Sequence, residues 1–259
     1  MHTTEKKTRR WAGDGPLYEI AWGDATWSLR VDAEVPGLYA DLSGPLLGLE
    51  GLAEAGRREP GALSARSLSA HECRFDRVEA TYRPEGWGEM TIRAAWFPVG
   101  DDGIGLEVEM SARSVEQLRR VEVMVLSTLE PPPPAGSPRS VEPRDRDAAA
   151  LSLDGRETDL SALATGPPGE TTGPWLASRT GREGWAYVEM ARPEDAARRI
   201  TEGTLPCHAT RYGLFGYDLE RGVVLRGRLR AFWLPSGGAS NRAETLYRDF
   251  LGEPPPLRT

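Results

Sequence analysis

Short runs that alternate apolar and polar residues fill the first half of the chain and are broken by Gly, Pro and Asp. A two-residue alternation is typical of strands that bury one face. The runs at residues 17–22 and 26–31 are separated by Gly23 and Asp24, which predicts a hairpin. Residues 77–129 hold four more runs with short, turn-rich connections, so an antiparallel meander is expected there.

A segment rich in proline and charge, residues 131–147, interrupts this pattern and is expected to run over the surface. The strand pattern returns after it, and neither half alone has enough strands for a sandwich. We therefore predict a single β-sandwich domain over residues 13–259 that contains this connection. Residues 1–12 are charged and read as a disordered or extended tail.

Helical patterns are scarce. Near the end of the chain, Asn241 suits an N-cap, Leu246 and Phe250 share one stripe, and Gly252 suits a stop, which predicts a C-terminal amphipathic helix. Residues 192–200 are expected to form a second, short helix. The fold class is all-β, an antiparallel two-sheet sandwich closed at one edge by the C-terminal helix, with a lipocalin-type barrel as the alternative.

Composition and charge narrow the class of partner. The chain is 39% hydrophobic, which allows a substantial core, and its formal net charge is -7. A negative field repels nucleic acid and anionic membranes, so neither is expected as a partner. No stretch approaches the roughly 20 apolar residues of a membrane span. The charged start lacks the apolar run of a secretory signal, which favours a cytoplasmic protein, and an oligomer or a protein partner is left open.

The two cysteines, Cys73 and Cys207, belong to no CxxC pair and are expected to be reduced. His71 and His208 lie next to them in the sequence, so a zinc site of two Cys and two His is an alternative. On an extended chain His71 and Cys73 share a face, whereas Cys207 and His208 point to opposite faces. Such a site would need a turn at the second pair, and we predict neither a metal nor a cofactor.

The strongest polar pattern is a row of three arginines. Residues 217–225 predict a tight hairpin in which Gly222 adopts a positive φ. After that turn, alternation places Arg226, Arg228 and Arg230 along one face of a strand. Like charges this close require solvent or opposing carboxylates.

Carboxylates that could oppose this row alternate with apolar residues in two other runs. Glu107 and Glu109 do so in residues 103–110, and Glu189 does so in residues 185–190. One interpretation is a solvated outer sheet with weak surface ion pairs. The other is a polar concave face of Arg, Glu and aromatic side chains that binds sugars or carboxylated small molecules.

The strand style and length of residues 82–98, 103–110 and 214–234, followed by a final helix, resemble the galactose-mutarotase-like β-supersandwich. This resemblance covers most of the chain and includes no short signature. It implies a carbohydrate-active protein: an aldose epimerase with a His general acid and a Glu general base, or a carbohydrate-binding domain.

The candidate site follows from the arginine row and from this resemblance. The candidate catalytic residues are His208, Glu107 and His71, and the candidate substrate-binding residues are Arg226, Arg228, Arg230, Glu109, Glu189 and Trp185. The expected partner is a monosaccharide or a sugar acid, and the expected chemistry is proton transfer between a His, a carboxylate and the sugar. The alternative is a non-catalytic sugar-binding or interaction subunit, in which the histidines are structural hydrogen bonders.

Overall fold

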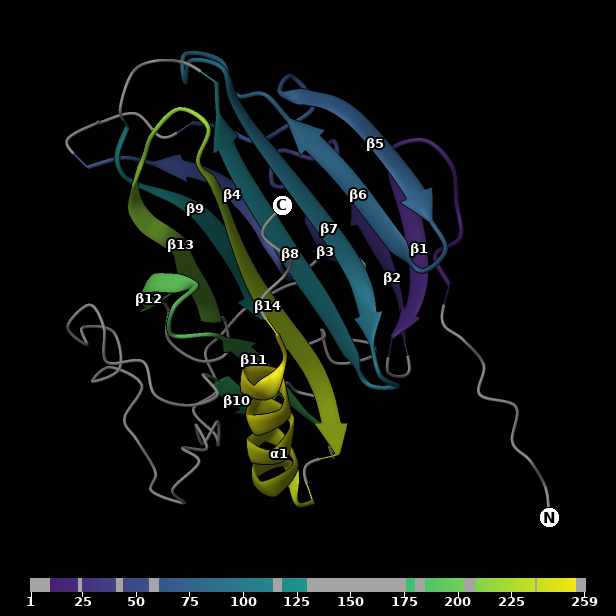
Figure 1. The fold of residues 1–259 in the computed structure, drawn as a ribbon. Helices are drawn as coiled ribbons and strands as arrows, with labels where there is room; N and C mark the ends of the chain where they lie inside the picture. Colours follow the sequence, from purple (N-terminus) through teal and green to yellow (C-terminus); the bar gives the residue numbers. More distant parts are fainter. Residues whose placement is uncertain are drawn as a thin grey trace, which may run out of the picture.

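Three antiparallel sheets and one helix make up the described part of the computed structural model (Figure 1). The described residues are 10–22, 25–40, 44–55, 61–113, 118–129, 176–179, 185–202, 208–235 and 237–254. A three-stranded sheet has the order β1-β2-β3 and comprises β1 Leu17–Trp22, β2 Ala25–Arg30 and β3 Gly37–Tyr39. A four-stranded sheet has the order β12-β13-β9-β4 and comprises β12 Ala196–Glu202, β13 His208–Leu219, β9 Leu118–Leu129 and β4 Gly48–Ala53.

The largest sheet is seven-stranded, with the order β10-β11-β14-β8-β7-β6-β5. Its strands are β10 Leu176–Arg179, β11 Trp185–Ala191, β14 Val224–Pro235, β8 Gly103–Ala112, β7 Met90–Val99, β6 Arg77–Tyr82 and β5 Leu68–Arg74. Among the described strands this order is open, with β5 and β10 at the edges. The expected all-β sandwich is therefore confirmed, and the described strands do not form a closed barrel.

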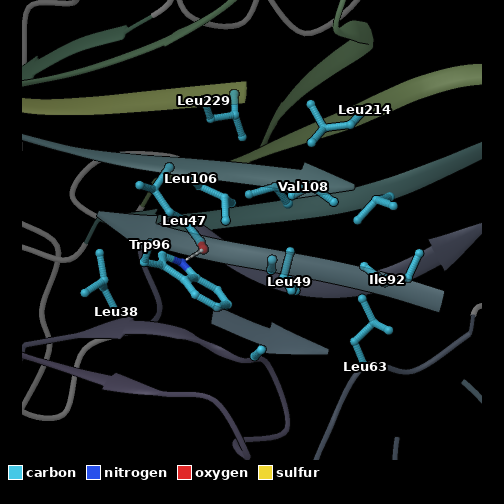
Figure 2. Close-up of a cluster of buried hydrophobic side chains, with 14 of the residues drawn as sticks. Leu38, Leu47, Leu49, Leu63, Ile92, Trp96, Leu106, Val108, Leu214 and Leu229 are labelled. Carbon is cyan, nitrogen blue, oxygen red and sulfur yellow. Dashed lines mark hydrogen bonds between the residues drawn. The ribbon is translucent and has the colours of Figure 1, made fainter. Parts of the chain in front are cut away.

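The main core lies between the seven-stranded sheet and the two smaller sheets. Ile92, Trp96 and Val108 face it from the large sheet, and Leu214 faces it from β13 (Figure 2). Trp96 is fully buried, and its Nε1–H donates to the carbonyl of Leu47 at 3.0 Å. This bond satisfies the only polar atom of a large aromatic side chain, so the ring can be buried at little polar cost.

The first hairpin, β1 and β2, is confirmed, and β5 to β8 follow one another as neighbours in the large sheet. The expected four-strand meander over residues 77–129 is wrong at its last strand, because β9 lies in the four-stranded sheet between β13 and β4. The free edge of β8 is taken by β14 instead. Alternation of apolar and polar residues indicates that a strand buries one face, but it does not indicate which strand becomes its neighbour.

The turn before the arginine row connects two sheets. Gly222 has the expected positive φ, 82°. The expected hairpin is wrong, however, because β13 pairs with β9 and β12, whereas β14 pairs with β8 and β11. The N–H of Gly222 donates to Ala112 at the end of β8, so the turn passes from one layer of the sandwich to the other.

The C-terminal helix is confirmed as α1 Ala239–Gly252, which packs on one end of the large sheet beside β11 and β14 (Figure 1). Its N-cap is Gly238 with a φ of 81°, so the expectation of Asn241 as N-cap is wrong. The short helix expected over residues 192–200 is also wrong. The chain there enters β12, because pairing with β13 outweighs the weak local helix signals.

Part of the expected N-terminal tail joins the fold. Trp11 is only 7% exposed, and Ala12 exchanges two backbone hydrogen bonds with Glu19 of β1. Residues 131–147 and Cys207 lie outside the described residues, so the single domain over residues 13–259 stays a prediction. None of the described helical residues forms a segment long and apolar enough to cross a bilayer.

Candidate functional site

The three arginines of β14 lie on one face of the large sheet, as the sequence predicts. Arg226 is opposite Glu109 and Arg228 is opposite Glu107 in the register with β8. The Nε–H of Arg226 donates to Glu109 Oε2 at 2.7 Å. This face, on the side of the sheet away from the main core, is called the outer face below.

Ion pairs continue across the outer face onto β7 and β6. Arg77 donates to Glu79 at 2.7 Å and to Glu107 at 3.3 Å, and Arg93 reaches Glu79 at 3.2 Å. These side chains are partly exposed, so each pair contributes only ~0–1 kcal/mol. The sheet itself supplies the carboxylates for Arg226, Arg77 and Arg93, which favours the surface interpretation for this part of the face.

Glu189 does not lie on the outer face, which corrects the sequence prediction. Its neighbour Met190 is opposite Arg230 in the register, so Glu189 points to the other side, between the sheets. Trp185 lies an even number of residues earlier on the same strand and shares that inner side. The outer side of β11 holds Val188 and Met190, which pack beneath α1, so both sides of this strand are buried.

His71 does not lie beside the candidate carboxylates either. It pairs with Ala80, in the row that leads through Ala94 to Val108, and Glu107 projects to the opposite face of the sheet. The His71 Nδ1 is 2.9 Å from the hydroxyl of Tyr18. The two candidate catalytic residues His71 and Glu107 therefore lie on opposite faces of the large sheet.

The remaining residues of the zinc alternative are only partly described. Cys73 is exposed and is a free thiol, whereas Cys207 lies outside the described residues. His208 begins β13, where it pairs with Leu129 of β9. Within the described ranges, no three or more His, Cys, Asp or Glu side chains are grouped so as to hold a metal ion. The proposed four-residue site is untested.

The most unusual polar group is a buried carboxyl between the sheets. Glu189 is 0% exposed, and its Oε1 accepts a hydrogen bond of 2.7 Å from the hydroxyl of Tyr187, two residues earlier on β11. Ser127 of β9 and Tyr212 of β13 approach it from the four-stranded sheet, and Arg199 of β12 acts on it by its charge. We call these five residues the interior polar cluster.

Burial governs the protonation of this cluster. It raises the pKa of Glu189 above the ordinary 4.5, and the nearby hydroxyls and the charge of Arg199 only partly offset this increase. Burial also raises the pKa of Tyr212 well above 10.0 and lowers that of Arg199. A carboxyl with a raised pKa exchanges its proton closer to neutral pH than an exposed glutamate does, which suits a general acid or base.

Two polar atoms of the cluster are not held in well-formed hydrogen bonds. Among the described residues, Glu189 Oε2 and the Tyr212 hydroxyl are buried without a hydrogen bond of normal geometry, although Tyr212 is close enough to affect the pKa of Glu189. Leaving such an atom unsatisfied costs about 1–3 kcal/mol. Both atoms could bind a hydroxyl group of a ligand, one as acceptor and the other as donor or acceptor.

Aromatic rings lie next to the cluster. The ring of Tyr187 is 5.1 Å from that of Trp233 and 6.3 Å from that of Trp22, and Trp27 packs on both tryptophans. Trp22 and Trp27 point inward because side chains alternate between the two faces of β1 and of β2. Aromatic faces beside a carboxyl and hydroxyls are a combination that suits the apolar and polar sides of a sugar ring.

Sequence reasoning missed most of this cluster. Ser127, Tyr187, Arg199 and Tyr212 belong to no motif and come from four strands in two sheets. The one signal was the burial pattern itself, because Tyr187 and Tyr212 stand at positions that alternate as inward-facing. That signal identifies core positions and does not identify which of them meet.

The fold and the interior polar cluster define an antiparallel β-sandwich with a buried carboxyl between its sheets. Comparisons with protein-family models and with curated proteins found no match. By structure, the chain is similar to a protein from Escherichia coli K12 that is provisionally named aldose 1-epimerase. The TM-score is 0.46 at 10% identity, over 88% of this chain and 99% of the other. This likeness assigns no reaction or residue to this chain.

Proposed function

We propose that this protein binds a monosaccharide or a sugar acid at the interior polar cluster and transfers protons at its anomeric centre. The observation that carries this proposal is a buried pair of polar atoms, Glu189 Oε2 and the Tyr212 hydroxyl, that face each other without a hydrogen bond of normal geometry. A ligand with several hydroxyl groups can satisfy both at once. The tryptophans beside Tyr187 would pack on the apolar face of the sugar ring.

The reaction that suits these groups is the interconversion of anomers. The Glu189 carboxylate takes the proton of the anomeric hydroxyl, the bond between C1 and the ring oxygen breaks, and an acid protonates the ring oxygen. The open-chain aldehyde then rotates about its C1–C2 bond, and the reverse steps close the ring, so no proton or electron is consumed overall. We assign the acid to His208, because an imidazole can exchange protons near neutral pH and because His208 belongs to β13, the strand that carries Tyr212.

Arg199 would bind the ligand and connect the cluster to solvent. It is the charged member of the cluster besides Glu189, and it is half-buried whereas Glu189 and Tyr212 are fully buried. A guanidinium at this position favours hydroxyl-rich ligands and carboxylates. Sugar acids are therefore expected to bind at least as well as neutral sugars.

The second candidate function is sugar binding without catalysis. It is favoured by one observation: the described side chains bring no histidine next to a carboxylate, since His71 contacts Tyr18. In this case the interior polar cluster binds a ligand and performs no proton transfer. The two functions share the site and differ only in turnover.

The test measures anomer exchange of D-galactose, D-glucose and D-glucuronate by polarimetry and NMR. Glu189→Gln should lower kcat/KM by about 100-fold or more, as expected for loss of a general base. The matched control is Glu109→Gln, the same change on the outer face of the sheet. Turnover of the natural protein should fall as the pH drops through the raised pKa of Glu189, because the base must be ionised.

The outcomes separate the candidates. If Glu109→Gln loses turnover while Glu189→Gln retains it, the interior site is wrong. If no sugar is turned over but one raises the melting temperature, the binding function is correct; a sugar at 100 times its Kd adds about 2.7 kcal/mol. If none of these sugars is turned over or shifts the melting temperature, both candidates fail. His208→Ala with unchanged turnover would remove the histidine from the mechanism.

A further inference from the structure

A second polar group lies on the outer face where α1 ends. Arg230 Nη2 donates to both carboxylate oxygens of Glu253, at 2.7 and 2.6 Å, and Arg228 Nη1 donates to Oε2 at 3.4 Å. Arg192 lies close by and donates to the carbonyl of Phe250 at 2.7 Å. We call Arg192, Arg228 and Arg230 the C-terminal arginine cluster.

The cluster is built into the protein. The side chains of Arg192, Arg228 and Arg230 are only 3%, 11% and 13% exposed. The ring of Phe250 holds two of them, with the guanidinium of Arg230 at 4.6 Å and that of Arg192 at 5.1 Å from its centroid. Held in this way, the guanidinium groups lose little further freedom when they bind a ligand.

Docking of the helix accounts for only part of this arrangement. Arg192 satisfies carbonyls at the C-terminal end of α1, where a cation is favourable. Arg228 and Arg230 instead bind the side chain of Glu253, which follows the helix and is 36% exposed. Arg228 Nη2 also donates to the carbonyl of Pro254 at 2.7 Å. The Glu253 carboxylate is therefore a surface group that the helix does not need for its own hydrogen bonds.

The cluster has more N–H donors than Glu253 can bind. Among the described residues, the Nε of Arg192 and the Nε of Arg228 are buried without a partner. The charge of Arg192 also contributes to lowering the pKa of Arg228, after burial itself. The other carboxylates near the cluster are Glu194, 3.9 Å from Arg192 and 63% exposed, Asp195, which accepts the backbone N–H of Arg228, and Glu107.

We propose that the C-terminal arginine cluster is a binding site for the phosphate group of a small molecule, and that the Glu253 carboxylate occupies it when no ligand is bound. A phosphate brings more acceptor oxygens and more negative charge than a carboxylate, which suits two guanidinium groups that share one carboxylate beside a third guanidinium. The phosphate displaces the Glu253 carboxylate and accepts the hydrogen bonds that Arg228 and Arg230 donate to it in the free protein. This site is on the opposite face of the sheet from Glu189, so it stands independently of the proposed function.

Glu253 competes with the ligand from within the chain. A tethered competitor acts at an effective concentration in the mM range, so phosphate binds weakly to the natural protein. Glu253→Gln removes the competing charge and keeps the size of the side chain. The affinity for phosphate should therefore rise by about tenfold or more in this variant.

The experiment titrates inorganic phosphate and acetate into the natural protein and Glu253→Gln at constant ionic strength, by calorimetry and ³¹P NMR. The expected result is tighter phosphate binding in the variant, with acetate at least about tenfold weaker than phosphate. The matched control is Arg93→Gln, which removes a guanidinium from the same face and should leave binding unchanged. Arg230→Gln in the Glu253→Gln background should abolish it.

Three results would overturn the proposal. The first is the absence of phosphate binding to folded Glu253→Gln, with circular dichroism reporting the fold. The second is equal loss of binding in Arg93→Gln, which would indicate nonspecific attraction to the outer face. The third is equal affinity for acetate and phosphate, which would assign the site to carboxylates. None of these measurements uses a sugar, so their failure is distinct from failure of the proposed function.

Discussion

Asp195 connects the two layers of the sandwich and should make stability depend on pH. The register of β11 with β14 ends at Ala191 and Leu229, and just beyond that point Asp195 Oδ2 accepts the backbone N–H of Arg228 at 3.0 Å. The carbonyl of Asp195 accepts the N–H of Phe215 in the other layer at 2.9 Å. Burial raises the pKa of this carboxyl from 3.8 to about 6, although the hydrogen bond from Arg228 and nearby arginines oppose the increase.

The size and sign of the effect follow from linkage. Well below pH 4 the carboxyl is protonated in both states, and it does not weaken the fold. Between pH 4 and 6 the unfolded chain ionises first, so stability falls as pH rises, and above pH 6 the loss is complete. A shift of about two pKa units corresponds to about 3 kcal/mol, and partial exposure of the group reduces this to about 1–2 kcal/mol.

Asp195→Asn tests this reasoning, because the amide oxygen can still accept the Arg228 N–H. Urea unfolding followed by tryptophan fluorescence at pH 4, 5, 6, 7 and 8 gives the free energy of unfolding of each protein. The advantage of the variant over the natural protein should grow by about 1–2 kcal/mol from pH 4 to 7. Asp218→Asn is the matched control, since Asp218 also accepts a backbone N–H, from Arg120, but is exposed. A difference that is flat, or that grows toward low pH, would refute the argument.

Two further substitutions test the packing. Phe250→Ala removes a fully buried ring between α1 and the large sheet, so we expect a loss of about 3–5 kcal/mol in urea unfolding; a loss below about 1 kcal/mol would mean that the helix is not anchored there. Tyr82→Phe removes the buried hydrogen bond of 2.8 Å to the carbonyl of Val31, and we expect a loss of about 1–3 kcal/mol; an unchanged midpoint would show that this carbonyl finds another donor.

Local pattern predicts the strands of this protein well and their partners poorly. Alternation predicts the first hairpin and places Arg226, Arg228 and Arg230 on one face opposite Glu107 and Glu109, because side-chain direction depends only on the backbone of each strand. It does not predict sheet membership. The chain between β13 and β14 has the residues of a hairpin turn, yet the strands separate, because each finds partners in its own layer.

The position of Glu189 shows why the site is harder to predict than the fold. The run at residues 185–190 alternates like any strand with one polar face, and the sequence therefore predicts an exposed glutamate. The prediction fails because α1 covers the other face: Val188 and Met190 pack against the helix, and Glu189 must turn inward. A charged residue on a strand with two buried faces is costly, and this one has a tyrosine hydroxyl as its bonded partner and a raised pKa. Burying Glu189 has no evident benefit for packing. Its cost is therefore the physical reason to look for the protein's chemistry at Glu189 and not along the ion-paired arginines.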